Sequence, residues 1–355
     1  MSSFEIGGRK IGLDQPPYVI AELSANHNNR LDRAFEIVDV AAAAGASAIK
    51  LQTYTADSLT LDSDRADFRI DEGPWAGQTL HALYRQASTP WEWHEAIFRR
   101  ARDRGLTIFS SAFDKDAVMK LVELGVPAFK VASFELVDIP LIEFIAATGK
   151  PLIMSTGLAE LSEIEEAVRA ARRAGCRSLA LLHCISAYPA PIEEANLATI
   201  ADLRRRFDVE AGLSDHTLGT TASVAAVALG ATIIEKHVTM RRADGGPDAA
   251  FSLEPDELAE LVRSCTAARN AIGTASYTRR PSEVQNLRFR RSLYAVADIP
   301  AGAALTEVNV RSIRPGFGLP PRFLPELMTR RAARTILRGE PLSWDMIEGG
   351  PDRGG

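Results

Sequence analysis

The sequence predicts a parallel (β/α)8 barrel followed by a small β-rich domain. Eight short apolar runs rich in β-branched residues alternate with amphipathic segments of helical spacing. The alternation stops near residue 275, after about the length that a barrel of this class needs. A doubly wound open sheet is the alternative, but such a sheet does not need an eighth strand to close.

The eight predicted strands share a run of buried-type residues followed by polar ones. They are 18–25, 46–54, 106–113, 128–135, 151–157, 179–186, 209–217 and 232–239. Helical spacing is found between them at 33–45, 92–105, 115–125, 161–175 and 220–230, and the last and longest helix is predicted at 254–273. Several helical segments end in glycine, which best accepts the left-handed conformation at a helix end.

Two segments depart from this rhythm. Residues 55–91 form a long insertion after the second strand, which we expect to be a functional loop over the barrel mouth. Beyond the barrel domain at 1–275, a polar and basic stretch at 276–290 is typical of a linker. Residues 291–355, with short strands and Gly/Pro turns, form a small domain. A domain of this size is only marginally stable alone, so we expect it to dock on the barrel of its own or another subunit.

Composition excludes several classes of function. The chain has 355 residues, is 46% hydrophobic and 25% charged, and has a net charge of −5 without a Lys/Arg block, so no nucleic-acid partner is expected. Its three cysteines, Cys176, Cys184 and Cys265, lack CxxC spacing and favour a reducing compartment, the cytoplasm. The amino terminus lacks the apolar core of a signal peptide, and no apolar run is long enough to span a membrane.

Polar residues cluster at the carboxyl ends of the predicted strands, where barrels of this class carry their active sites. In strand order they are Glu22, Asn26 and His27; Lys50, Gln52 and Tyr54; Ser110, Ser111 and Asp114; Lys130, Ser133 and Glu135; Ser155, Thr156 and Gly157; His183, Ser186 and Tyr188; Ser214, Asp215 and His216; Glu235, Lys236 and His237. Nearly every strand therefore ends in groups that bind anions, metal ions or sugar hydroxyls.

Two of these residues, His216 and His237, follow adjacent strands. A lone histidine at a strand end is more often structural, but two on neighbouring strands favour a divalent first-row metal. Two imidazoles make a weak site, so substrate oxygens would complete it. We interpret Asp215 and Glu235 as groups that orient the rings, and Cys184 as a core residue.

Lys50 and Lys130 each lie within an apolar strand, where an unpaired ammonium group is costly. They could be paired with a neighbouring carboxylate, such as Glu22 or Glu135. Two inward lysines beside many hydroxyls also predict a site for a phosphate dianion together with a carboxylate, because charge-assisted hydrogen bonds to such anions are strong.

Several stretches resemble the sialic acid synthase family of phosphoenolpyruvate-condensing enzymes. They are "IAELSANHNN", "FKVASFEL", "MSTGLAE", "LLHCISAYPAP", "GLSDHT" and "IIEKHVTMRRADGGPDAAFSLEP". The carboxyl-terminal "RSLYAVADIPAGAALTEVNVRSIRPGFGL" resembles the antifreeze-like (SAF) domain of those enzymes. The resemblance covers nearly the whole chain. Within the family, "KLQTYTADSLTLD" and "GPWAGQTLHALYRQASTPWEWH" are most similar to the pseudaminic acid synthases.

The resemblance implies condensation of phosphoenolpyruvate with an open-chain acetamido sugar, most closely 2,4-diacetamido-2,4,6-trideoxy-L-altrose, to a nine-carbon 2-keto sugar acid. It implies that His216 and His237 hold Mn²⁺ or Mg²⁺, that Glu22 moves a proton, and that Arg314 reaches the active site from the small domain of a swapped dimer. Phosphoenolpyruvate would be held by Lys50, Ser111, Lys130, Ser133, Ser155, Ser186 and Ser214, and the sugar by Gln52, Tyr188 and Asp248. Many members carry Asn where this chain has Ser186.

Other functions remain open at this point. Within the family, the chain could be an N-acetylneuraminate or legionaminate synthase. A barrel metallohydrolase would usually have an HxH pair on the first strand, where this chain has "NHNN". A non-catalytic carbohydrate-binding barrel would not need two buried lysines and a metal pair.

Overall fold

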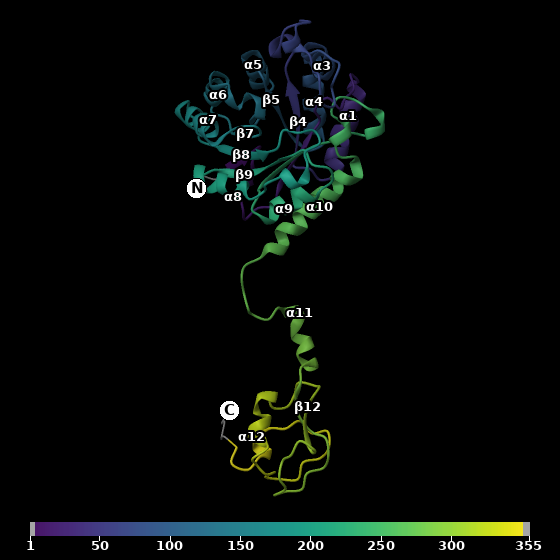
Figure 1. The fold of residues 1–355 in the computed structure, drawn as a ribbon, viewed down its shortest axis with the longest axis vertical. Coiled ribbons are helices and arrows are strands. Elements are labelled where there is room, and N and C mark those ends of the chain that lie inside the picture. Colours follow the sequence, from purple (N-terminus) through teal and green to yellow (C-terminus); the bar gives the residue numbers. More distant parts are fainter. Residues whose placement is uncertain (1–3, 351–355) are drawn as a thin grey trace. The chain divides into compact units, whose positions relative to one another are not determined.

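The chain folds into two compact units in this computed structural model, which describes residues 4–350. The first unit ends at Gly273 and the second begins at Thr274, just after the longest helix, α10 (Pro255–Ile272) (Figure 1). The predicted linker 276–290 lies in the second unit and contains a short helix, α11 (Pro281–Val284).

The first unit is a closed eight-stranded parallel barrel, as predicted. Its strand order is β10-β3-β4-β5-β6-β7-β8-β9. The open-sheet alternative is wrong, because β10 pairs with β3 as well as with β9. The strands are β3 (Tyr18–Glu22), β4 (Ala48–Thr53), β5 (Thr107–Ala112), β6 (Phe129–Val131), β7 (Leu152–Ser155), β8 (Leu179–Cys184), β9 (Glu210–Asp215) and β10 (Ile233–His237). A hairpin, β1 (Phe4–Ile6) and β2 (Arg9–Ile11), precedes them.

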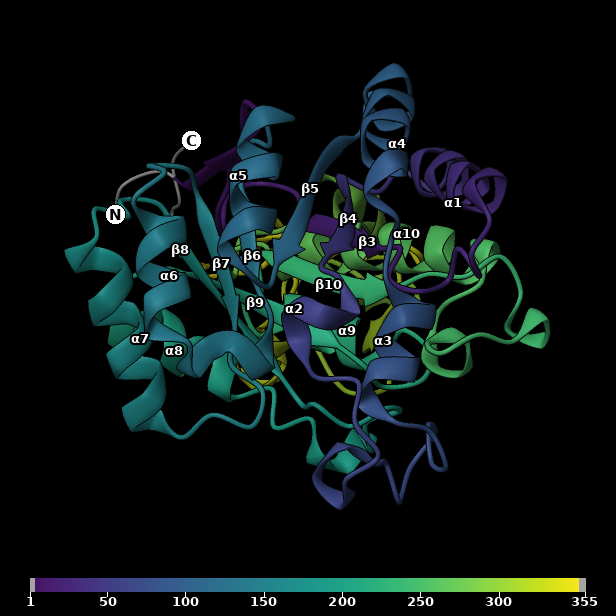
Figure 2. The same ribbon diagram turned by 90° about the horizontal axis from the view of Figure 1, so that it is seen from above.

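Helices surround the barrel (Figure 2). They are α1 (Leu31–Ala43), α4 (Trp91–Asp103), α5 (Lys115–Glu123), α6 (Ile139–Ala146), α7 (Leu161–Arg173), α8 (Thr199–Phe207), α9 (Thr221–Ala228) and α10. The sequence explains α7 well, because Ile164, Val168 and Ala171 are buried at helical spacing and Gly175 follows at a positive φ of 101°.

The insertion at 55–91 is partly helical, contrary to the predicted loop. It contains α2 (Ala56–Leu59) and α3 (Leu80–Ala87). Thr79 stabilises the start of α3, because its hydroxyl accepts a hydrogen bond from the Ala82 N–H at 3.2 Å. The eight residues of α3 are too few for a strong periodic signal, which is why the sequence pattern missed them.

Side chains alternate along each strand between the barrel interior and the surrounding helices. Fully buried residues such as Ile20 and Ile233 point inward below Glu22 and Glu235, which lie two positions further along the same strands. The polar interior layer at the carboxyl ends therefore rests on an apolar layer, and residues between these positions face the helices instead.

The second unit has its own hydrophobic core, formed by residues such as Leu293, Ile299, Val310 and Ile336. Strands β11 (Ser292–Ala295) and β12 (Val310–Ile313) pair antiparallel, and a short helix, α12 (Leu324–Leu327), packs into the core. Among residues 4–350, no helix is both long and apolar enough to span a membrane.

Candidate active site

Four charged residues form a buried cluster inside the barrel, here called the charged cluster: Glu22, Lys50, Lys130 and Glu235. Lys50 Nζ lies 2.6 Å from Glu22 Oε2 and 3.7 Å from Glu235 Oε1, and Lys130 Nζ donates to Glu235 Oε1 at 3.3 Å. All four residues are at most 4% exposed. From the sequence, Glu135 is a possible carboxylate partner for a buried lysine. In the structure, Lys130 pairs with Glu235 instead.

The two carboxyl groups of the charged cluster differ in their electrostatic surroundings. Burial raises the pKa of Glu22, and the single close ammonium group of Lys50 does not offset it. Burial also raises the pKa of Glu235, but the charges of Lys130 and Lys50 outweigh it and hold this pKa below its ordinary value. Glu22 therefore takes up a proton more readily, and such a separation of two carboxyl groups suits proton transfer.

Two predicted serines bond directly to the charged cluster. Lys50 donates to Ser111 Oγ at 3.1 Å, and Ser214 Oγ donates to Glu235 Oε1 at 3.0 Å. The predicted residues of six strands, β3, β4, β5, β6, β9 and β10, thus meet inside the barrel.

Ser133 and Ser186 surround Gly157, just after β7, and Ser155 is the last residue of that strand. The Gly157 N–H donates to Ser133 Oγ at 3.1 Å, and a Cβ at this position would lie 2.2 Å from Ser186 Oγ and 2.8 Å from Ser133 Oγ. Ser155 Oγ is buried and has no hydrogen-bond partner in the described part of the chain. These hydroxyls form a polar cradle that is open only because residue 157 has no side chain, and an unpaired buried hydroxyl there calls for a ligand.

His216 and His237 face each other with ring centroids 5.3 Å apart. His216 Nδ1 lies 3.0 Å from the carbonyl oxygen of Ile185, which can only accept a hydrogen bond, so Nδ1 carries the proton and Nε2 keeps a free lone pair. His237 Nδ1 is buried and has no hydrogen-bond partner within residues 4–350. Burial, and then the neighbouring His216, hold the pKa of His237 well below its ordinary value, so its ring is neutral.

Neither Asp215 nor Glu235 orients a histidine ring, so that hypothesis is wrong. Glu235 belongs to the charged cluster. Asp215 points outward, where it accepts hydrogen bonds from the Thr217 N–H at 2.9 Å and Ser223 Oγ at 2.6 Å and lies 2.9 Å from Lys236 Nζ. Side chains alternate along a strand. Asp215 and Lys236 directly precede the inward-facing His216 and His237, so they must face the helices.

We expect Lys236→Met to lower the free energy of unfolding by about 3–5 kcal/mol, because it leaves the Asp215 carboxylate buried without its ammonium partner. Urea unfolding of the full chain, followed by circular dichroism, measures this. Arg169→Met is the control, since Arg169 is 61% exposed in its ion pair with Glu165 and should change stability by less than about 0.5 kcal/mol. Equal effects of the two substitutions would contradict the expectation.

Two of the three predicted sugar-site residues, Tyr188 and Asp248, lie beside the histidines. The Tyr188 ring is 4.5 Å from the His216 ring. Asp248 Oδ2 accepts a hydrogen bond from Ser24 Oγ and lies 4.0 Å from His237 Nδ1, and burial raises the pKa of Asp248 to about 6. Gln52 is half-buried near the end of β4, next to Ser111 in register.

Two other residues, Cys184 and His183, lie differently from their expected places. Cys184 is buried, as expected, but its Sγ lies 3.7 Å from His216 Nδ1, so it lines the site. Cys184 pairs in register with Ser214 of β9, which faces the barrel interior. The strand register could therefore have shown that Cys184 faces the interior as well. His183 points outward and bonds to the carbonyl oxygen of Ala195 at 2.8 Å. Arg314 is exposed and directly follows β12 in the second unit.

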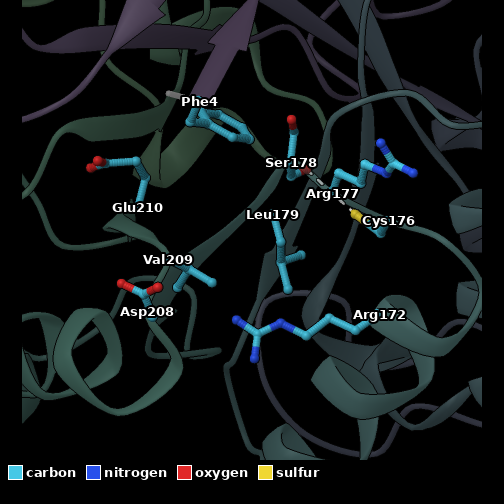
Figure 3. A pocket seen from close by; sticks show the side chains of 9 residues that line it. All are labelled: Phe4, Arg172, Cys176, Arg177, Ser178, Leu179, Asp208, Val209 and Glu210. Carbon is cyan, nitrogen blue, oxygen red and sulfur yellow. Dashed lines mark hydrogen bonds between the residues drawn. The ribbon is translucent and has the colours of Figure 1, made fainter. Parts of the chain in front are cut away.

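A separate cavity of about 160 Å³ lies away from this chemistry (Figure 3). Its lining includes Leu179 and Glu210, the first residues of β8 and β9, together with Phe4, Arg172 and Arg177. It is therefore at the amino ends of the strands, where barrels of this class do not carry their active sites.

The closed barrel and the polar groups at the carboxyl ends of its strands define the class of (β/α)8-barrel enzymes. Within that class, the chain belongs to the NeuB family, which its residues 37–277 match. Residues 290–348 match the SAF domain. The sequence-based resemblance to this family and the predicted fold class are thus confirmed.

Individual relatives agree with this assignment. The chain is 42% identical to a pseudaminic acid synthase of Helicobacter pylori over 94% of this chain and 98% of the relative. It is 32% identical to an N,N'-diacetyllegionaminic acid synthase of Legionella pneumophila over 93% of this chain and 94% of the relative. The crystal structure of an N-acetylneuraminic acid synthetase from Leptospira borgpetersenii superposes with a TM-score of 0.71 at 33% identity, over 81% of this chain and 96% of that one.

Proposed function

We propose that the chain is a pseudaminic acid synthase. It condenses phosphoenolpyruvate with 2,4-diacetamido-2,4,6-trideoxy-L-altrose and water to give pseudaminic acid and phosphate. The observation that carries the proposal is the 42% identity to the Helicobacter pylori pseudaminic acid synthase over nearly the full length of both chains. C3 of phosphoenolpyruvate forms a bond to the sugar aldehyde carbon, water adds to C2, and phosphate leaves with the oxygen that joined it to C2.

Phosphoenolpyruvate fits the two polar groups of the barrel interior. Its phosphate would occupy the cradle around Gly157, where Ser133, Ser155 and Ser186 supply hydroxyls. Its carboxylate would lie beside Lys50, Lys130, Ser111 and Ser214. With Glu22 protonated, the two ammonium groups of the charged cluster outnumber its one remaining carboxylate, Glu235, so the cluster can balance part of the negative charge of this ligand.

Glu22 is the group that we assign to proton transfer. Its Oε1 is buried and has no hydrogen-bond partner among the described residues, while Oε2 is held by Lys50. A carboxyl group with a raised pKa and one free oxygen can take a proton from the attacking water or give one to the new hydroxyl group.

The two histidines suit a divalent metal, Mn²⁺ or Mg²⁺. The free Nε2 lone pair of His216 and the unpaired, buried His237 Nδ1 support such a role. In the described part of the chain, no group of three His, Cys, Asp or Glu side chains is placed to hold an ion, so substrate or water oxygens would complete the site. When bound, the metal would polarise the sugar aldehyde as a Lewis acid. Gln52, Tyr188 and Asp248 would position the sugar beside it.

The active form that we propose is a domain-swapped homodimer, in which the SAF domain of a second copy covers the barrel mouth and brings Arg314 to the sugar. Support comes from apolar side chains in the loops after β6, β7 and β9, where Phe134, Leu158 and Leu218 are 58%, 72% and 61% exposed. Such side chains gain stability when a partner covers them. The cytoplasm stays the predicted location.

Phosphate release from phosphoenolpyruvate tests this function, with three sugars assayed in parallel. We expect the highest kcat/KM with 2,4-diacetamido-2,4,6-trideoxy-L-altrose. A higher value with N-acetylmannosamine or the legionaminic acid precursor would make the chain an N-acetylneuraminate or legionaminate synthase. Release that does not depend on any sugar would indicate a hydrolase, and no release a carbohydrate-binding protein.

We expect Gly157→Ala to raise the KM for phosphoenolpyruvate about 10- to 100-fold, because a methyl group there displaces hydroxyls that bind a charged phosphate. The KM for the sugar should not change. Gly12→Ala is the control, since Gly12 also lacks a positive φ and a Cβ there meets only Asp14 Oδ1 at 3.1 Å and Glu210 Oε1 at 3.7 Å. A change in the sugar KM alone would contradict the cradle assignment.

A further inference from the structure

The tip of the 55–91 insertion is a short hairpin with an ordered base. Arg69 forms a bridge with Thr79, the Ile70 N–H donates to the Gln78 carbonyl at 2.9 Å, and the Gly77 N–H donates to the Ile70 carbonyl at 2.8 Å. Thr79 also caps α3, so the hairpin is attached to a helix. The tip is therefore held at its base rather than hanging as a free loop.

Trp75 is the aromatic residue at this tip. Its indole N–H donates to the carbonyl oxygen of Pro247 at 2.8 Å, and its ring centroid lies 5.6 Å from that of Tyr188. Both contacts join the insertion to other loops at the barrel mouth: Pro247 directly precedes Asp248, and Tyr188 follows β8. In Figure 2 the dark blue insertion and the teal segment after β8 lie together at this side of the barrel.

Trp75 extends an aromatic wall that reaches the two histidines. Tyr188 lies 5.1 Å from Phe251 and 4.5 Å from His216, and Phe251 lies 5.0 Å from His237, measured between ring centroids. The only polar atom of the Trp75 side chain is already bonded to Pro247. Trp75 can therefore offer a ligand apolar surface but no further hydrogen bond from its side chain.

We propose that Trp75 is a specificity-determining residue of the sugar site, where its indole ring receives the methyl groups of the sugar. This inference rests on the proposed function. The 2,4-diacetamido-2,4,6-trideoxy sugar has a methyl group at C6 and two acetamido methyl groups, whereas N-acetylmannosamine has a C6 hydroxyl and one acetamido group. The Trp75 ring, whose one polar atom is already bonded to Pro247, favours the methyl groups and leaves a hydroxyl without a partner.

The test compares Trp75→Ala, Trp75→Phe and the wild-type chain with both sugars. We expect Trp75→Ala to lower kcat/KM for the diacetamido sugar about 10- to 100-fold and that for N-acetylmannosamine by less than about threefold, since methyl groups in an apolar pocket account for differences of this size. Trp75→Phe keeps an apolar ring and should keep most of the preference. The KM for phosphoenolpyruvate should stay unchanged in both variants.

Leu61→Ala is the matched control, because Leu61 lies in the same insertion, is 65% exposed and should change neither sugar's kcat/KM. Equal losses for both sugars in Trp75→Ala would assign Trp75 to loop structure alone and overturn the inference, and so would no loss for either. The wild-type chain separates the two proposals. If it prefers N-acetylmannosamine, the proposed function fails; if it prefers the diacetamido sugar and Trp75→Ala keeps that preference, only the inference fails.

Discussion

Replacing His216 or His237 with alanine is expected to lower the rate of sugar-dependent phosphate release by about 10³-fold or more, since Lewis-acid stabilisation amounts to several kcal/mol and each 1.4 kcal/mol is a factor of ten. The two ring nitrogens that we propose as metal ligands lie at the ends of adjacent strands, so the loss of either would leave one protein ligand. Binding of Mn²⁺ alone, followed by electron paramagnetic resonance, should weaken in parallel. EDTA should abolish wild-type activity reversibly.

His183→Asn is the control for the histidine substitutions. His183 lies on β8 and is buried to a similar extent as the two other histidines, but it points outward and bonds to the Ala195 carbonyl. It should lower stability without changing Mn²⁺ affinity. Full activity of a chelated, metal-free wild-type preparation would exclude the metal assignment, whatever the variants do.

The second large effect concerns Arg314. We expect Arg314→Ala to abolish activity while leaving the barrel folded. If Arg314 acts in the partner's active site, an Arg314→Ala chain mixed with a Glu22→Ala chain should regain about one quarter of wild-type activity. Half of the randomly mixed dimers are heterodimers, and one of the two sites in each has both wild-type residues. Subunit exchange followed by phosphate release measures this.

Arg311→Ala is the matched control, because Arg311 is also exposed and lies on β12, three residues before Arg314. It should be active without mixing. Deletion of residues 285–355 should leave a folded barrel with almost no activity. If the mixture stays inactive although heterodimers form, Arg314 does not act across subunits.

Much of the barrel could be predicted from local patterns. The predicted strand 179–186 corresponds to β8 at Leu179–Cys184, and the predicted helix 254–273 to α10 at Pro255–Ile272. The helices that the sequence missed lacked the usual signals. For example, α8 has nine residues and is followed by Asp208 at a φ of 49° rather than by glycine, so no stop signal marked its end.

By itself, the sequence determined the eight strands, six of the helices that surround them, the polar residues at the strand ends and the family. These follow from periodicity along the chain and from contiguous stretches of residues. Only the tertiary structure decided which groups meet. Lys130 pairs with Glu235, 105 residues away, rather than with nearby Glu135, because barrel closure brings the inward positions of distant strands to one level. The strand register likewise turns Asp215 outward to Lys236, since neighbouring residues on a strand must face opposite sides.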